Sequence, residues 1–275
     1  MKLTEKAMLV RQQISNWTNT KFDEKATNEV LAANNAQTES GRFNKVLLPK
    51  EALSEINKIV SAARAHHYEK TLPWEDWGAR LLPAAQYFDY VNEQRNFKQD
   101  FEAAAARFCA DYPQYVNAAR QTLAGLFNDN DYPDEYDVRH KFSYDFTFLP
   151  LPEQADFRVN LGEDEEERVK NDIESHVQTM LKRVTTDLWT RAYKVVDHMQ
   201  QRLAETDKPF HGTLVSNIQE LVDLLPSLNI MDDPELDRIC HEMKDELCRY
   251  EPQALRDDPE LRKQTAAKAA SILED

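Results

Sequence analysis

EDEEERVKNDIESHVQTMLKRVTTDLWTRAYKVVDHMQQRLAET, residues 163–206, is a long amphipathic run without glycine or proline. Apolar residues recur along it at spacings of three and four: Val169, Ile173, Val177, Met180, Leu181, Val184, Leu188, Val195, Met199 and Leu203. This period predicts one helix of roughly 60 Å, at about 1.5 Å per residue. Because such a helix is longer than one compact core, we expect it to pack against the helices of residues 84–127 as a long antiparallel arm, or against another subunit.

The stretch directly before this run, HKFSYDFTFLPLPEQADFRVNLG at residues 140–162, has the period of a strand. Aromatic residues alternate with polar ones near 141–149, and a second short strand is predicted near 156–161. Two strands alone are marginal in water, so a third near 7–17 is the available partner. The resulting small sheet would reverse the chain between two long helical segments.

The predicted fold is therefore mainly α. It has a long antiparallel helical arm, a small β-element with strands near 7–17, 141–149 and 156–161, and a C-terminal helical bundle. We expect an N-terminal strand and helix segment over 1–50, the arm with its β-island at 138–161 over 51–210, and C-terminal helices over 211–275, all in one elongated unit.

Prolines and aspartates give the expected helix ends. DDPEL occurs at 232–236 and at 257–261, and each copy supplies an Asp N-cap followed by proline at the first helical position. Pro113 predicts a break or kink in the helix that begins near Pro83, and Pro226 predicts the end of a helix over 213–225.

The net charge of −15 is unevenly distributed. Lys and Arg minus Asp and Glu give 8 − 5 = +3 for residues 1–50, 11 − 18 = −7 for 51–160 and 15 − 26 = −11 for 161–275. An acidic surface argues against broad nucleic-acid binding, which depends on Lys and Arg. Three cysteines at no familiar spacing, no apolar leader and no membrane-spanning run favour a cytoplasmic protein without a membrane segment.

Familiar catalytic and metal-binding patterns are missing from the sequence. It has no HExxH, GxSxG, Walker or GxGxxG pattern, and only five glycines. Cys240 and Cys248 on one helix would lie roughly 12 Å apart along its axis, too far to share a zinc ion. We therefore expect no metal and no cofactor, and a non-enzymatic protein is favoured over an enzyme.

Aromatic and basic side chains are concentrated in RAHHYEKTLPWEDWGARLLPAAQYFDY, residues 64–90. Such residues could grip a peptide or stack on bases, although a buried helix-to-helix corner is the favoured interpretation. We name this segment the aromatic corner. Its candidate partner-binding residues are Tyr68, Trp74, Trp77, Arg80, Tyr87 and Tyr90.

Four stretches carry a resemblance to a known family: GRFNKVLLPKEAL at 41–53, HYEKTLPW at 67–74, FLPLPEQADFRVNL at 148–161 and LVDLLPSLNI at 221–230. Together they resemble a family of bacteriophage and prophage proteins of unknown function, whose genes lie near those of MoxR-type AAA+ ATPases and von Willebrand factor A-type, cobalt-chelatase-like proteins. The resemblance implies a phage protein of the host cytoplasm that acts as an adaptor or a substrate-side component for such an ATPase. It transfers no functional residue.

Three functions follow as hypotheses. The leading one is a non-enzymatic interaction protein that binds a protein partner, or a second copy of itself in a homo-oligomer, through the helical arm and the aromatic corner. The second is an acidic mimic of DNA that blocks a host defence nuclease. The third is nucleic-acid handling through the positive N-terminal segment and the aromatic corner.

Overall fold

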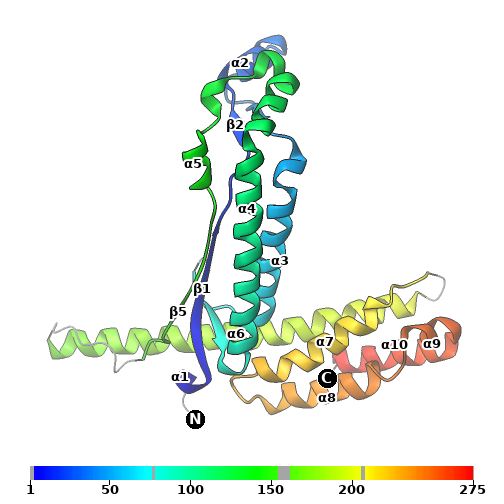
Figure 1. Ribbon diagram of the computed structural model, residues 1–275. Coiled ribbons are helices and arrows are strands. Elements are labelled where there is room, and N and C mark those ends of the chain that lie inside the picture. Colours follow the sequence, from blue (N-terminus) through cyan, green and yellow to red (C-terminus); the bar gives the residue numbers. More distant parts are fainter. Residues whose placement is uncertain (1–2, 76–77, 154–161, 206–207, 275) are drawn as a thin grey trace. The chain divides into compact units, whose positions relative to one another are not determined.

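The computed structural model describes residues 3–75, 78–153, 162–205 and 208–274 (Figure 1). The fold is mainly α, as predicted. The helices are α1 (Leu3–Lys6), α2 (Glu24–Ala33), α3 (Ser54–Lys70), α4 (Tyr87–Leu123), α5 (Glu135–Arg139), α6 (Glu163–Ala204), α7 (Thr213–Leu228), α8 (Pro234–Leu247), α9 (Pro252–Asp257) and α10 (Pro259–Glu274). The strands are β1 (Ala7–Ser15), β2 (Thr20–Phe22), β3 (Asn44–Val46), β4 (Arg80–Pro83) and β5 (Ser143–Leu149).

The chain forms two compact units that interleave along the sequence. The first unit comprises Met1–Arg11, Tyr68–Asp89 and Phe148–Asp275, and the second comprises Gln12–His67 and Tyr90–Thr147. Each unit has its own cluster of buried apolar side chains.

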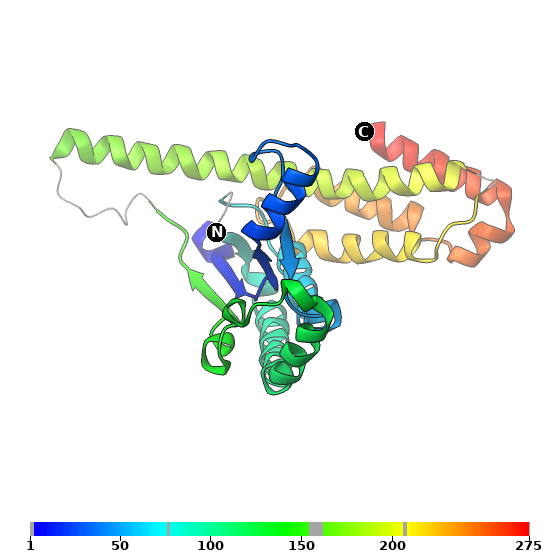
Figure 2. The same ribbon diagram turned by 90° about the horizontal axis from the view of Figure 1, so that it is seen from above.

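In the first unit, the second half of α6 packs with the C-terminal helices. Its buried side chains begin at Met180 and end at Leu203, and they join the cluster formed by α7, α8 and α10. These three helices lie along the second half of α6 only (Figure 2). The long helix is confirmed, and α7, α8 and α10 cover the second half of its apolar face.

The two DDPEL copies begin helices as predicted. Asp233 Oδ1 accepts hydrogen bonds from the backbone N–H groups of Glu235 and Leu236 at the start of α8. Asp258 Oδ1 does the same for Glu260 and Leu261 at the start of α10. In both copies the proline sits where its missing N–H costs no helical hydrogen bond.

The predicted strands near 7–17 and 141–149 are confirmed as β1 and β5. β1 is the central strand of a three-stranded sheet with the order β4-β1-β5. The strand predicted at 156–161 lies outside the described residues. β4, which sequence periodicity did not indicate, pairs antiparallel with β1 from Ala7 opposite Pro83 to Val10 opposite Arg80.

In the second unit α3 and α4 run side by side (Figure 1). Their facing residues include Ile56, Ala63, Phe101 and Phe108, all nearly inaccessible to solvent. Of the predicted break or kink at Pro113, the break is wrong, since α4 continues to Leu123, and the kink stays a prediction. Buried side chains before and after the proline hold the helix together, and their burial offsets the roughly 3 kcal/mol that an internal proline costs. Likewise α7 continues past Pro226 to Leu228.

Candidate functional site

The aromatic corner is not one surface. In the first unit Trp74 is buried, whereas Tyr68 is 57% exposed and carries the guanidinium of Arg80 over its ring, 4.5 Å from the centroid. Tyr87 is half-buried against Phe148, with ring centroids 5.3 Å apart. Trp74 is therefore part of the core, whereas exposed Tyr68 packs with Arg80, which is half-buried and donates hydrogen bonds to Thr71. Trp77 lies outside the described residues.

Tyr90 belongs to the core of the second unit. Its side chain is fully buried, and its hydroxyl lies 2.7 Å from Nδ1 of His67, which is itself buried. The ring of His66 stacks on Tyr90 with centroids 5.7 Å apart. These contacts give Tyr90 and both histidines packing roles.

Arg191 of α6 fixes the end of α3 within the first unit. Its guanidinium donates hydrogen bonds to the carbonyl oxygens of Tyr68, Glu69 and Thr71 at 3.0, 2.7 and 2.8 Å. Asp187 accepts from Arg191 Nε at 2.8 Å and orients the guanidinium. Because the last carbonyls of a helix have no partners inside the helix, this arginine acts as a side-chain cap.

The first half of α6 has no buried side chain before Met180. Its apolar positions Val169, Ile173 and Val177 are only half-buried, and they continue the stripe that is covered from Met180 onward; Val177 packs against the edge of the first unit's core cluster. Glu163, Asp164, Glu165 and Glu166 occupy the first turn, where carboxylates interact favourably with the helix dipole. We call Val169, Ile173 and Val177 the α6 stripe.

A buried polar network links β1, α3, α4 and β5 in the second unit. Gln94 is fully buried, and its Oε1 accepts hydrogen bonds from Gln12 Nε2 at 2.8 Å and from the hydroxyl of Tyr144 at 2.7 Å. Gln12 Nε2 also lies 3.2 Å from the carbonyl oxygen of Ala63, and Gln94 Nε2 lies 3.1 Å from Nδ1 of His66. Burial raises the pKa of Tyr144 to about 12, so its hydroxyl stays protonated and able to donate.

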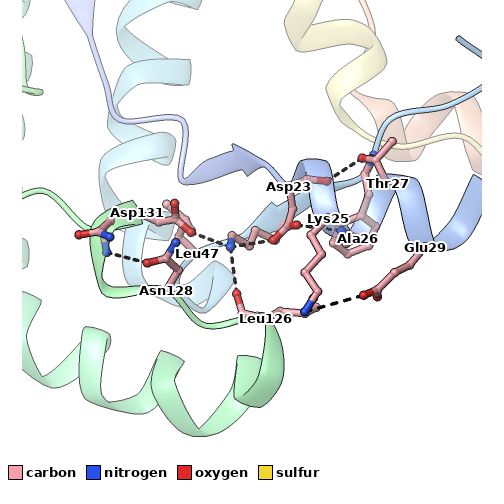
Figure 3. Close-up of polar contacts among 12 residues, drawn as sticks. Asp23, Lys25, Ala26, Thr27, Glu29, Leu47, Leu126, Asn128 and Asp131 are labelled. Atoms are coloured by element: carbon pink, nitrogen blue, oxygen red, sulfur yellow. Dashed lines mark hydrogen bonds and ion pairs between the residues drawn. The ribbon is translucent and has the colours of Figure 1, made fainter. Parts of the chain in front are cut away.

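A buried ion cluster in the second unit surrounds Lys45, whose side chain is 5% exposed. Its ammonium lies 2.9 Å from Asp23 Oδ2, 2.6 Å from Asp131 Oδ2 and 2.9 Å from the carbonyl oxygen of Leu126 (Figure 3). Burial alone would lower the pKa of Lys45, but hydrogen bonds to the two carboxylates raise it above its usual range. The pKa of Asp23 is lowered, first by the N–H of Ala26 and then by Lys45.

The described residues contain no group of three or more His, Cys, Asp or Glu arranged to hold a metal ion. Burial raises the pKa of the Cys240 and Cys248 thiols to about 11, which disfavours a thiolate nucleophile. No helix among the described ranges is long and apolar enough to cross a bilayer.

Sequence reasoning missed the Lys45 cluster and the Gln94 network. Lys45 stands in the short strand NKV, and its two acidic partners are 22 and 86 residues away along the chain. Gln94 lies among polar residues of α4, and the spacing of apolar residues along the helix does not indicate that the face carrying Gln94 is buried.

We compared the chain with known proteins. No protein family, curated protein or solved structure matches it.

Proposed function

We propose that this protein is a non-enzymatic interaction protein that docks a protein partner on the first half of α6. One observation carries the proposal: the α6 stripe continues a covered apolar face but is itself only half-buried. A helix stripe of this kind is the usual anchor of helix-in-groove recognition, in which apolar side chains four residues apart enter a hydrophobic groove. Each fully covered Val or Ile side chain would contribute about 1.5–3 kcal/mol.

The charge around the stripe defines the partner. Acidic residues fill the first turn of α6, and residues 161–275 carry 15 − 26 = −11. A complementary groove is apolar along its floor and lined by Lys or Arg near the end that receives Glu163. The resemblance to phage proteins whose genes neighbour MoxR-type AAA+ ATPases makes such an ATPase the first partner to test, with this protein as its adaptor in the host cytoplasm.

A site-specific photo-crosslinker tests the docking face directly. We would place the photoreactive amino acid at Ile173 on the stripe and, as a matched control, at Ser175, which is exposed and two residues further along the helix. Both variants would be expressed in cells that contain the neighbouring ATPase, and crosslinked products would be identified by mass spectrometry. We expect a defined adduct from position 173 and none from position 175.

Three outcomes separate the hypotheses. An adduct with an ATPase that still forms when photolysis is carried out in high salt supports the adaptor, because salt does not screen apolar contacts. An adduct with a second copy of this chain replaces the adaptor by self-assembly. Association with a DNA-binding nuclease that disappears as salt rises favours the acidic mimic instead, since salt screens attraction between exposed charges.

A further inference from the structure

A pocket of about 660 Å³ lies in the second unit, beside the end of β1 and along α3. Its walls include Asn16, Trp17, Lys50, Leu53, Asn57 and Arg64. This volume is within the range of roughly 300–1,000 Å³ that is typical of small-molecule sites. The proposed function does not use this pocket, because the α6 stripe belongs to the first unit.

The charge of the pocket is opposite to that of the chain. Lys50 and Arg64 line it, and no Asp or Glu is among its lining residues. Within the described ranges neither cation forms an ion pair, and Arg64 makes only a long contact of 3.5 Å from Nη2 to the carbonyl oxygen of Ile14. In a protein with a net charge of −15, two cations without acidic partners at one pocket attract an anion.

Trp17 supplies an aromatic wall. Its ring is half-buried and is held from behind by Phe108 and Tyr112, with centroid distances of 6.2 and 5.9 Å. An indole fixed in this way offers a preformed surface for a planar ring, and stacking of a base on an aromatic side chain contributes about 1–3 kcal/mol.

Asn16 gives a third recognition element. Its amide nitrogen donates to Asn57 Oδ1 at 2.6 Å, while its own amide oxygen is buried without a hydrogen-bond partner among the described residues. An unsatisfied buried acceptor costs about 1–3 kcal/mol. A ligand that shifted the Asn16 amide slightly would bring one of its own donor groups within hydrogen-bond reach of the amide oxygen. That hydrogen bond would recover part of the lost free energy.

We propose that the Trp17 pocket binds a small phosphorylated molecule with a planar ring, a class of which a nucleoside monophosphate is the simplest probe. A phosphate monoester carries a charge of about −1.5 to −2 at pH 7, so a single cation stabilises it more than it does a carboxylate with one charge. Lys50 and Arg64 lie roughly 20 Å apart along the helix axis, so one phosphate contacts one of them. The ring would stack on Trp17, and its N–H or O–H group would reach Asn16.

Isothermal titration calorimetry on the full chain tests the proposal with three probes. Adenosine 5′-monophosphate has both the phosphate and the ring, adenosine lacks the phosphate, and ribose 5-phosphate lacks the ring. The variants Lys50→Ala and Arg64→Ala each remove one cation, and Lys58→Ala is the matched control because Lys58 is an exposed α3 residue outside the pocket lining. Thermal unfolding would verify that all three variants fold.

We expect adenosine 5′-monophosphate to bind more tightly than either fragment. Whichever of Lys50→Ala and Arg64→Ala removes the cation that contacts the phosphate should weaken binding about tenfold or more, and Lys58→Ala should not. Absence of binding by any probe at millimolar concentration overturns the proposal, as does equal binding by all four proteins. Binding of single-stranded oligonucleotides that strengthens with length and is lost in salt also overturns it, in favour of a nucleic-acid surface.

Discussion

Lys45 is the residue whose removal we expect to destabilise the second unit most. The variant Lys45→Met leaves the carboxylates of Asp23 and Asp131 facing each other in a nearly buried site. Breaking a buried ion pair by removing one partner typically costs about 3–5 kcal/mol. Urea denaturation should show this loss. The control Lys25→Ala removes an exposed ion pair with Glu29 and should cost no more than about 0.5 kcal/mol. Equal losses in the two variants would contradict the structure.

Asp23 should make stability depend on acid pH. Its pKa in the folded chain is lowered by the N–H of Ala26 and by Lys45, so its ionised form favours folding. This contribution is present above the ordinary Asp pKa of about 3.9 and is lost as the pH falls through the lower folded value. Asp23→Asn keeps an N-cap acceptor but cannot ionise. The free energy of unfolding of this variant should therefore fall less steeply below about pH 4, and an unchanged slope would refute the assignment.

At the scale of elements, the two halves of α6 should respond differently to truncation. Val184 is fully buried, so Val184→Ala should cost on the order of 2 kcal/mol through lost contacts and a residual cavity. Ile173 lies on the α6 stripe, and Ile173→Ala should change stability by less than about 0.5 kcal/mol. Thermal unfolding of the isolated protein measures both. A large loss from Ile173→Ala would mean that part of this chain covers the stripe.

The DDPEL caps should each stabilise the chain measurably. Asp233→Ala and Asp258→Ala remove the acceptor for two backbone N–H groups at the start of α8 and α10. We expect each to cost about 1 kcal/mol. Asp257→Ala is the control, because Asp257 accepts only from the exposed side chain of Gln253 and should cost far less. A control as harmful as the cap variants would show that charge, not capping, matters there.

Local signals made much of the element map predictable. The alternation of side chains around Tyr144 predicts a strand, because successive side chains of a strand point to opposite faces. The three-and-four spacing around Val184 predicts one face of a helix. The structure contains both elements. β4 escaped prediction because Arg80–Pro83 is too short to show a period, and it forms only by pairing with β1. The break predicted at Pro113 is wrong because the sequence does not show that buried side chains on both sides of the proline stabilise the helix.

The aromatic corner shows what sequence cannot resolve about a site. Trp74 and Tyr68 have similar chemistry and lie six residues apart, yet one is 2% exposed and the other 57%. Whether such a side chain is buried depends on which segments, distant in the sequence, pack against it, and no local sequence pattern shows this. The Trp17 pocket is a similar case, because Lys50 and Arg64 meet Trp17 only after α3 has packed.

At the scale of the whole molecule, the two separate cores should give separate patterns of hydrogen exchange. Leu188→Ala enlarges a space in the cluster of the first unit, and Phe101→Ala does so in the second. By mass spectrometry, we expect the first variant to lose amide protection mainly in α7, α8 and α10, and the second mainly in α3 and α4. If either substitution lowered protection equally in both units, the chain would unfold as one cooperative body.

The central position of β1 has a consequence for the chain as it is synthesised. Both strands that flank β1 come later in the sequence, at residues 80–83 and 143–149. At roughly 5–20 residues per second, β1 leaves the ribosome on the order of ten seconds before β5 follows. During that interval an apolar strand with open edges is available to any other nascent strand. Chains that stop before residue 143 keep one edge of β1 open permanently, and we expect them to aggregate.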